Sequence, residues 1–217
     1  MANAKTKTAP SADIPLRERI LYAAFSAFME KGYDGTSTLE IATRAKVSKR
    51  ELYALFRTKQ EMFAAGVAAR ARRMHGPLEL PLARDVGAFE RTLMDFATTF
   101  LREICNPVVV GVWRLAAVEA VRSPELARII DESGRLPNVR ALTHFLTQAQ
   151  SSGVICDGDP VEMTRQFFSL LSGDLLLRLI LRIAEPPGDA EVARRARVAT
   201  HVLLTLYPAK ALRREGA

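Results

Sequence analysis

The segment from Thr36 to Phe63 contains three helix-start signatures in close succession, and they constrain the fold more than any other feature. A hydroxyl residue is followed three positions later by a glutamate at Ser37, Ser48 and Thr58. In such a capping box the hydroxyl accepts a hydrogen bond from the backbone amide of the third helical residue, whose side chain reaches back to the cap. The intervals leave each of the first two helices about two turns, too short to persist alone in water. We therefore expect both to pack on other parts of the chain.

The two short helices separate apolar from basic side chains. Their apolar residues are Leu39, Ile41, Ala42, Ala45, Val47, Leu52, Leu55 and Phe56. Two short helices joined by a turn are the layout of a helix-turn-helix, whose second helix is presented to the major groove of DNA. Between residues 42 and 60 the single acidic residue, Glu51, is accompanied by six basic ones: Arg44, Lys46, Lys49, Arg50, Arg57 and Lys59. This pattern predicts a surface that meets phosphate groups.

The charge of the whole chain points to the same segment. The net charge is +7, and residues 1–75 hold fourteen Lys and Arg against seven Asp and Glu, whereas residues 76–217 hold seventeen of each. All of the excess positive charge therefore lies in the first third of the chain. A basic head on a neutral body favours a polyanionic partner that contacts the head alone.

From Leu16 to Val67 the chain resembles the amino-terminal domain of the TetR family of transcriptional regulators. The resemblance is carried by ILYAAFSAFMEKGYDGTS and LEIATRAKVSKRELYALFRTKQEMF. It departs at Arg50 and Glu51, where the family most often has a small residue followed by Thr, and this departure affects base preference. The resemblance implies that Tyr53 contacts the DNA backbone or a base edge and that Lys59 contacts a phosphate.

Other roles follow from the chemistry of the side chains. The free amides at the start of the helix after Thr36 and Ser37 favour an anion, although Ser37 also acts as a simple cap. Arg50 can pair with guanine and Glu51 could accept from cytosine, but the capping box makes a structural role for Glu51 the preferred interpretation. Half-buried packing is the alternative role for Tyr53. The predicted DNA-binding residues are Thr36, Ser37, Arg44, Ser48, Lys49, Arg50, Glu51, Tyr53 and Lys59.

We expect a disordered tail over residues 1–13, a helix-turn-helix domain over 14–75 and a helical domain over 76–217. The tail has no apolar core typical of a signal peptide, which indicates a cytoplasmic protein, and the alternative role for the tail is an arm that touches DNA. The first helix is predicted over Leu16–Lys31, ended by Gly32. A fourth runs from Thr58 to about Met74 and could act as a lever on the recognition helix. Breaks at Gly76, Pro77 and Pro81 place the boundary between the domains.

The rest of the chain is predicted to be helical, so the fold class is all-α. Apolar spacing predicts helices over 89–104 and 110–122, and another from the region of Pro137 to near Gly153. A strongly apolar helix is expected over 160–183, with Asp174, Arg178 and Arg182 as one polar stripe that makes it a poor membrane span. A last helix is expected over 190–207. The two closing helices resemble the dimer interface of the family, and completion of a monomeric core is the alternative.

A small-molecule pocket is predicted in the second domain from aromatic and polar side chains: Phe96, Phe100, Trp113, His144 and Phe167. Ordinary core packing is the alternative for each aromatic residue, and a place at the surface is the alternative for His144. Cys105 and Cys156 are expected to be reduced thiols that fill apolar space. The sequence has no phosphate-binding loop, zinc spacing or nucleophile elbow, so we expect no enzyme, cofactor or metal site.

These patterns predict a homodimeric transcriptional regulator, most consistent with a repressor. It would bind a palindromic operator in double-stranded DNA and leave it when a small apolar or amphipathic effector enters the second domain. No membrane partner is expected. The alternative is a basic helical DNA-binding or architectural protein that has neither operator specificity nor an effector.

Overall fold

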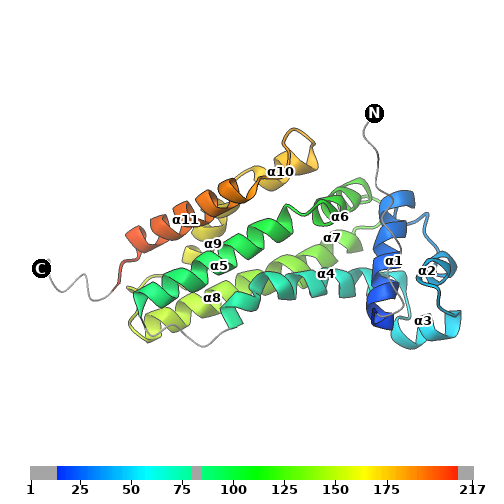
Figure 1. Ribbon diagram of the computed structural model, residues 1–217, viewed down its shortest axis with the longest axis horizontal. Helices are drawn as coiled ribbons and strands as arrows, with labels where there is room; N and C mark the ends of the chain where they lie inside the picture. Colours follow the sequence, from blue (N-terminus) through cyan, green and yellow to red (C-terminus); the bar gives the residue numbers. More distant parts are fainter. Residues whose placement is uncertain (1–13, 80–84, 210–217) are drawn as a thin grey trace, which may run out of the picture. The chain divides into compact units, whose positions relative to one another are not determined.

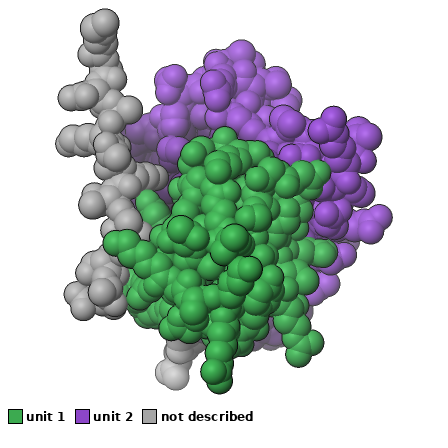
Figure 2. Space-filling model, turned by 90° about the vertical axis from the view of Figure 1, so that its right-hand side faces the viewer, with its two compact units in different colours: residues 1–66 green, residues 67–217 purple. Residues whose placement is uncertain are grey.

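Most of the helices that the sequence predicts are present in the structure, a computed structural model that describes residues 14–79 and 85–209 (Figure 1). Within these ranges every regular element is a helix, which confirms the all-α prediction. The predicted tail over residues 1–13, and Pro81 at the predicted boundary, lie outside the described residues. The chain forms two compact units, residues 1–66 and 67–217, coloured separately in Figure 2. This division falls inside a helix, whereas the sequence placed the boundary after residue 75.

Unit 1 contains α1 (Leu16–Lys31), α2 (Thr38–Ala45), α3 (Lys49–Leu55) and the start of α4 (Lys59–His75). The bounds of α1 agree with the prediction, and Gly32 ends it with a φ of 79° while its N–H donates to the Phe28 carbonyl. Phe63 of α4 packs in the core of the unit, stacked on Phe25 at 5.5 Å between ring centroids. Buried apolar side chains from all four helices complete this core: Ile20, Phe28, Ile41, Leu52, Phe56 and Met62.

The three predicted capping sites all hold a hydroxyl cap, but only one is a reciprocal capping box. Ser48 accepts from the Glu51 amide at 3.1 Å, and the Glu51 carboxylate accepts from the Ser48 amide at 2.7 Å. Ser37 caps α2 in the same way, but the Glu40 carboxylate binds Lys31 and Arg44 instead. Thr58 accepts from the Glu61 amide, while the Glu61 carboxylate accepts from the Arg57 amide. All three helix starts were therefore predicted correctly, and two of the reciprocal bonds were not.

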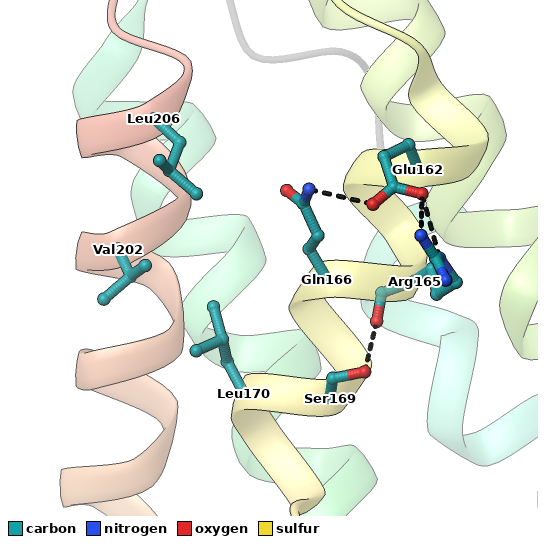
Figure 3. Close-up of a pocket in the computed structure, with 7 residues that line it drawn as sticks. All are labelled: Glu162, Arg165, Gln166, Ser169, Leu170, Val202 and Leu206. Carbon is teal, nitrogen blue, oxygen red and sulfur yellow. Dashed lines mark hydrogen bonds and ion pairs between the residues drawn. The ribbon is translucent and has the colours of Figure 1, made fainter.

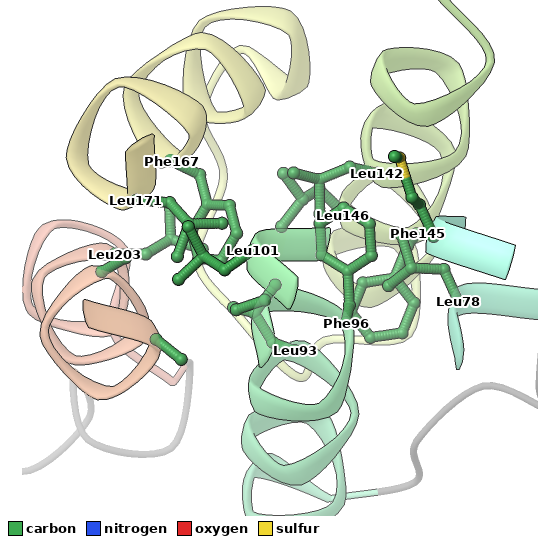
Figure 4. Packing of buried hydrophobic residues seen from close by; sticks show 14 of the residues in the cluster. Leu78, Leu93, Phe96, Leu101, Leu142, Phe145, Leu146, Phe167, Leu171 and Leu203 are labelled. Carbon is green, nitrogen blue, oxygen red and sulfur yellow. The ribbon is translucent and has the colours of Figure 1, made fainter. Parts of the chain in front are cut away.

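Unit 2 contains the end of α4 and a series of further helices. They are η1 (Gly76–Glu79), α5 (Val86–Ile104), α6 (Pro107–Val118), α7 (Glu125–Ile129), η2 (Ile130–Arg135), α8 (Leu136–Ser151), α9 (Pro160–Ser172), α10 (Leu175–Ile180) and α11 (Asp189–Leu206). Its core is centred on α5, whose Leu93, Phe96 and Leu101 lie between two groups of side chains (Figure 4). One group comes from α8 and η1, and the other comes from α9 and α11.

The prediction of a single helix over 160–183 is wrong, because the helix is interrupted between α9 and α10. Gly173 has φ 51° and ψ −129°, a conformation that L side chains rarely adopt and that glycine tolerates. The shorter α10 instead packs on α6, where Arg114 donates from Nε to the Ile180 carbonyl at 2.8 Å and from Nη2 to the Leu179 carbonyl. The predicted polar stripe is therefore divided: Asp174 precedes α10, Arg178 lies within it and Arg182 follows it with a φ of 58°.

Two more features differ from the sequence analysis. The chain does not restart at Pro137, because α7 continues through the π-helix η2 into α8. The break at Gly76 and Pro77 is occupied by the 3₁₀-helix η1.

Cys105 and Cys156 are free and buried, as expected, and burial raises the pKa of the Cys105 thiol to about 11.

In the part of the chain that the structure describes, no helix is both long and apolar enough to span a lipid bilayer.

Candidate nucleic-acid interface

The turn between α2 and α3 is held from both sides, and this fixes the direction in which α3 leaves it. Lys46 ends α2 in the left-handed conformation, with φ 53° and ψ 50°. The guanidinium of Arg19 on α1 donates to the Ala45 and Lys46 carbonyls at 3.0 and 3.1 Å. The Ser48–Glu51 box then starts α3. Sequence reasoning missed Arg19, since its partners lie more than twenty residues away.

Glu51 belongs to this local structure. Hydrogen bonds from the Ser48 backbone and side chain hold the pKa of the Glu51 carboxyl below its ordinary value of 4.5. The carboxylate is therefore committed to the start of α3, as the capping interpretation predicted. A carboxylate in that position is not free to accept from a base.

Lys49 and Arg50 lie on the first turn of α3, exposed and without an ion pair among the described residues. Lys46 and Arg57 are exposed on either side of them, and their side chains also make no ion pair in the described part of the chain. Four unpaired cations around a seven-residue helix concentrate positive charge at its outer face. Such a face attracts the phosphate backbone of a nucleic acid.

Arg44 has a different environment, although the sequence assigned it to the same surface. Its guanidinium donates to Glu30 at 2.7 Å and to Glu40 at 2.6 Å, and Lys31 also binds Glu40 at 2.7 Å. Glu30 and Glu40 raise the pKa of Arg44, while Arg44 lowers that of Glu30 and the pair of Lys31 and Arg44 lowers that of Glu40. This network joins α1 to α2, so Arg44 stabilises the unit.

Thr36 and Lys59 also bind within unit 1. Thr36 is buried, and its hydroxyl donates to the Gly32 carbonyl at 2.8 Å, which fixes the turn before α2. The Lys59 ammonium donates to the Tyr33 carbonyl at 2.8 Å and lies 4.6 Å from the centre of the Tyr33 ring. Their intramolecular partners make both side chains part of the scaffold of the head.

Tyr53, on the outer face of α3, lies beside the start of α2. Its ring is 48% exposed, and its hydroxyl lies 3.0 Å from the hydroxyl of Thr38, the first residue of α2. Ser37 is the exposed cap of the same helix. Because they lie at its start, the first backbone amides of α2 have no intrahelical partners. The hydroxyls of Tyr53 and Thr38 and the first amides of α2 form one exposed polar cluster that is suited to binding an anion. Thr38 was missed because nothing in the sequence pairs it with a tyrosine fifteen residues away.

The residues predicted for a small-molecule pocket in unit 2 do not form one cluster. Phe96 and Phe167 are fully buried, with ring centroids 6.3 Å apart, and Phe100 lies 5.8 Å from Phe96. Phe168, which was not predicted, completes this aromatic group at 4.9 Å from Phe100. Trp113 is half-buried on α6, and His144 is exposed on α8. The aromatic group is thus packed core, and His144 has the surface position that was its alternative.

An open groove of about 330 Å³ lies between α9 and α11. Leu170 of α9 and Leu206 of α11 extend into the space between these helices (Figure 3). Polar side chains of α9 also line the groove, and among them Glu162 binds both Arg165 and Gln166. None of the five predicted pocket residues lines this groove, whose lining is Glu162, Arg165, Gln166, Ser169, Leu170, Val202 and Leu206. In the described ranges no group of three or more His, Cys, Asp or Glu could hold a metal ion.

Known protein families match most of each of the two units. Residues 20–65 match the family described as bacterial regulatory proteins, tetR family. Residues 91–209 match the family described as AefR-like transcriptional repressor, C-terminal domain. Together these matches include the helix-turn-helix and most of the second unit.

Individual relatives extend over nearly the whole chain. The HTH-type transcriptional regulator YvkB of Bacillus subtilis is 26% identical over 177 residues, 81% of this chain and 90% of YvkB. The flavonoid-responsive regulator FrrA is 30% identical with a TM-score of 0.68, covering 88% of this chain and 96% of FrrA. A TetR transcriptional regulator from Agrobacterium tumefaciens is 26% identical with a TM-score of 0.74, covering 91% of this chain and 97% of its own. The chain therefore belongs to the TetR family of transcriptional regulators, which are DNA-binding proteins and not enzymes.

Proposed function

We propose that the protein is a homodimeric repressor that binds a palindromic operator and is released by a small apolar or amphipathic effector. The observation that carries the proposal is the outer face of α3, where Lys49, Arg50 and Tyr53 are exposed around a helix that Ser48 and Glu51 hold in place. A short rigid helix with free cations is the form in which a recognition helix meets the major groove.

We assign different roles to the exposed residues of the head. Arg50 reads a base, because its guanidinium can make two hydrogen bonds to the edge of a guanine. Lys49 contacts a phosphate, and the hydroxyls of Tyr53 and Thr38 bind a second one with the amides that follow Ser37. Arg44, Thr36, Lys59 and Glu51 act indirectly by keeping the helices in position.

Dimerisation is supported by an unusual concentration of exposed apolar side chains. Of the fourteen large apolar side chains exposed in the described residues, seven lie between Val161 and Leu206: Val161, Leu170, Leu177, Leu181, Ile183, Val198 and Leu206. Such a concentration is typical of a protein interface. Four of the seven lie on α9 and α11, and we propose that these two helices pair with the same helices of a second copy, which gives the symmetry of a palindromic operator.

Control by an effector is supported by one relative and by the course of α4 through both units. The relative FrrA is described as a flavonoid-responsive regulator. In this chain α4 runs without a break from Lys59 to His75 and so belongs to both units. An effector that binds unit 2 can release DNA only if it binds better to the conformation whose heads do not fit the operator.

A footprint on the DNA that flanks the gene of this protein tests the proposal. We expect a discrete palindromic region of protection, whereas even coverage would favour an architectural protein without operator specificity. In titrations against that region, Lys49→Ala should lower the slope of log affinity against log salt by about one. Arg50→Ala should cost about 1–3 kcal/mol and relax the preference at one base position of each half-site.

Two further variants complete the titration. Tyr53→Phe removes only the hydroxyl near Thr38 and should weaken binding. Arg91→Ala is the control, because Arg91 is exposed on α5 in the other unit and has no ion pair within the described ranges. Affinity that is unchanged in Lys49→Ala and Tyr53→Phe alike would contradict the assignment of this surface.

A further inference from the structure

The three sides of α2 have different surroundings. The first is buried in the core of unit 1 and consists of Ile41, Ala42 and Ala45. The second binds α1 through the ion pairs of Glu40 with Lys31 and of Arg44 with Glu30. The third is exposed and consists of Leu39, Thr43 and, at the end of the helix, Lys46. Residues at such intervals of four and three lie on the same side of a helix.

Both ends of this exposed side meet the candidate nucleic-acid interface. Leu39 directly follows Thr38, whose hydroxyl lies 3.0 Å from that of Tyr53 on α3. At the other end, Lys46 lies in the turn before α3 and is one of the cations that make no ion pair within the described ranges. The exposed side of α2 therefore extends from the Tyr53 hydroxyl to the start of α3, and Leu39 belongs to the surface proposed to meet DNA.

Leu39 is an apolar position on this otherwise polar surface. Its side chain is 54% exposed, more than any other large apolar side chain in the described part of unit 1. The hydroxyl of Thr43, one turn further on, already donates to the Leu39 carbonyl at 2.9 Å. Leucine has no hydrogen-bonding group, so it cannot hold a phosphate oxygen as a lysine or a hydroxyl does.

The major groove offers one apolar group to such a side chain. That group is the C5-methyl of thymine, which apolar side chains contact when they read an A·T pair. A leucine on a surface that enters the groove therefore suits a base edge, whereas its cationic neighbours suit the backbone. The chemistry of Leu39 thus separates it from Lys46 and Lys49, although all three belong to the same surface.

We propose that Leu39 packs against the methyl group of a thymine in each half-site, so that α2 reads a base in addition to α3. The inference rests on the operator binding proposed above and adds a second kind of base contact to it. Arg50 recognises a guanine by hydrogen bonds, and Leu39 recognises a thymine by apolar contact. Each half-site then contains both bases, because α2 and α3 pack together in one unit.

Replacement of single thymines by deoxyuridine tests the contact, because it removes only the methyl group. Each thymine of the region protected in the footprint is replaced in turn, and the affinity of the full chain is measured. The wild type should lose roughly fourfold in affinity at one thymine of each half-site, the value expected for one buried methyl group. Leu39→Ala should bind the unmodified region less tightly and should no longer distinguish thymine from deoxyuridine at that position. The four affinities form a double-mutant cycle that isolates the contact.

Salt dependence separates a base contact from a phosphate contact. The slope of log affinity against log salt should be unchanged in Leu39→Ala, since no cation is removed, whereas Lys49→Ala should lower it. Met29→Ala is the matched control, because Met29 is 39% exposed on α1 of the same unit. It should keep both the affinity and the loss caused by deoxyuridine. The thermal unfolding midpoint of Leu39→Ala should equal that of the wild type, because the side chain is exposed.

Three results would overturn the role of Leu39. They are a wild type that tolerates deoxyuridine at every thymine, a Leu39→Ala variant that keeps the full loss at each sensitive thymine, and an equal effect of Met29→Ala. In each of these cases a discrete footprint of the wild type would leave the proposed function intact. A wild type that protects no discrete region would instead contradict the proposed function, and the inference with it.

Discussion

Six basic residues between residues 42 and 60 have the same charge but different surroundings. Arg44 is held by Glu30 and Glu40, and Lys59 is bound to the Tyr33 carbonyl, whereas Lys49 and Arg50 have no ion pair within the described residues. A cation already held by two carboxylates gains less from a phosphate than a free one does. The outer face of α3 is thus defined as much by the cations that are occupied elsewhere as by those that are free.

Glu51→Gln tests the structural role of this carboxylate. Because the folded pKa lies below 4.5, the charge stabilises the fold at pH values above 4.5, and this stabilisation is lost as the pH falls through the lowered folded value. The wild type should therefore be more stable than Glu51→Gln near neutral pH, and the difference should vanish in acid. Urea unfolding followed by circular dichroism at a series of pH values measures it.

Glu185→Gln provides the comparison for that series, since Glu185 is exposed and makes no ion pair in the described part of the chain. It should unfold like the wild type at every pH. A difference between the wild type and Glu51→Gln that stays constant into acid would show that the charge of Glu51 does not support the start of α3.

Sequence reasoning located the hydroxyl caps because capping depends on residues three positions apart. It placed Glu51 in its box for the same reason. It failed to separate Arg44 from Arg50, because the partner Glu30 lies on another helix, fourteen residues earlier. A hydroxyl cap can be predicted from spacing, whereas the state of a surface cation depends on tertiary contacts.

Helix positions in this chain are set by glycines as much as by apolar spacing. The apolar spacing over 160–183 continues across Gly173, yet Gly173 ends α9 and allows α10 to pack on α6. In the other unit, Gly66 lies where a Cβ atom would overlap the ring of Phe25, so α1 and α4 can approach closely only with a glycine there. Periodicity predicted the existence of these helices but could not show which glycine interrupts one and which one permits close packing.

Gly66→Ala should destabilise unit 1 although alanine favours a helix. The gain in helix propensity is about 1 kcal/mol, whereas forcing a methyl group into a packed contact costs about 1–3 kcal/mol. Because the overlap is with a ring stacked on Phe63, we expect the larger penalty to prevail. The free energy of unfolding from a denaturant titration measures the balance.

Gly76→Ala is the corresponding control, because a Cβ atom at Gly76 would meet no heavy atom within 4 Å. Its stability should match or exceed that of the wild type. Greater stability of Gly66→Ala than of the wild type would mean that α1 and α4 can separate without loss.

The molecule combines a basic unit with a second unit that carries an exposed apolar face. Val161, Leu170, Val198 and Leu206 are between 40% and 62% exposed on α9 and α11. The sequence predicted that these helices close the fold, and their periodicity left pairing of two chains and completion of one core both open. Exposure in the folded chain favours pairing, which is a property that no pattern of apolar residues establishes alone.

Leu206→Asp should convert a dimer into a monomer, since a charge in an apolar interface remains unpaired. Sedimentation velocity at micromolar concentration measures the change, and operator affinity should fall with it because a monomer contacts one half-site. Val118→Asp is the control: Val118 is 81% exposed on α6, outside α9 and α11. A wild type that sediments as a monomer, or a dimer that persists in Leu206→Asp, would contradict the proposed interface.

The unbroken course of α4 limits how this protein can be recombined with its relatives. Because the division between the units falls within α4, no loop is available there for joining the head of one regulator to the body of another. A splice at that point has to keep the helical phase, since one inserted residue turns everything beyond it by about 100°. An insertion of seven residues, close to two full turns, would restore the phase while lengthening the helix by roughly 10 Å. The useful graft points are therefore set by the pitch of a helix.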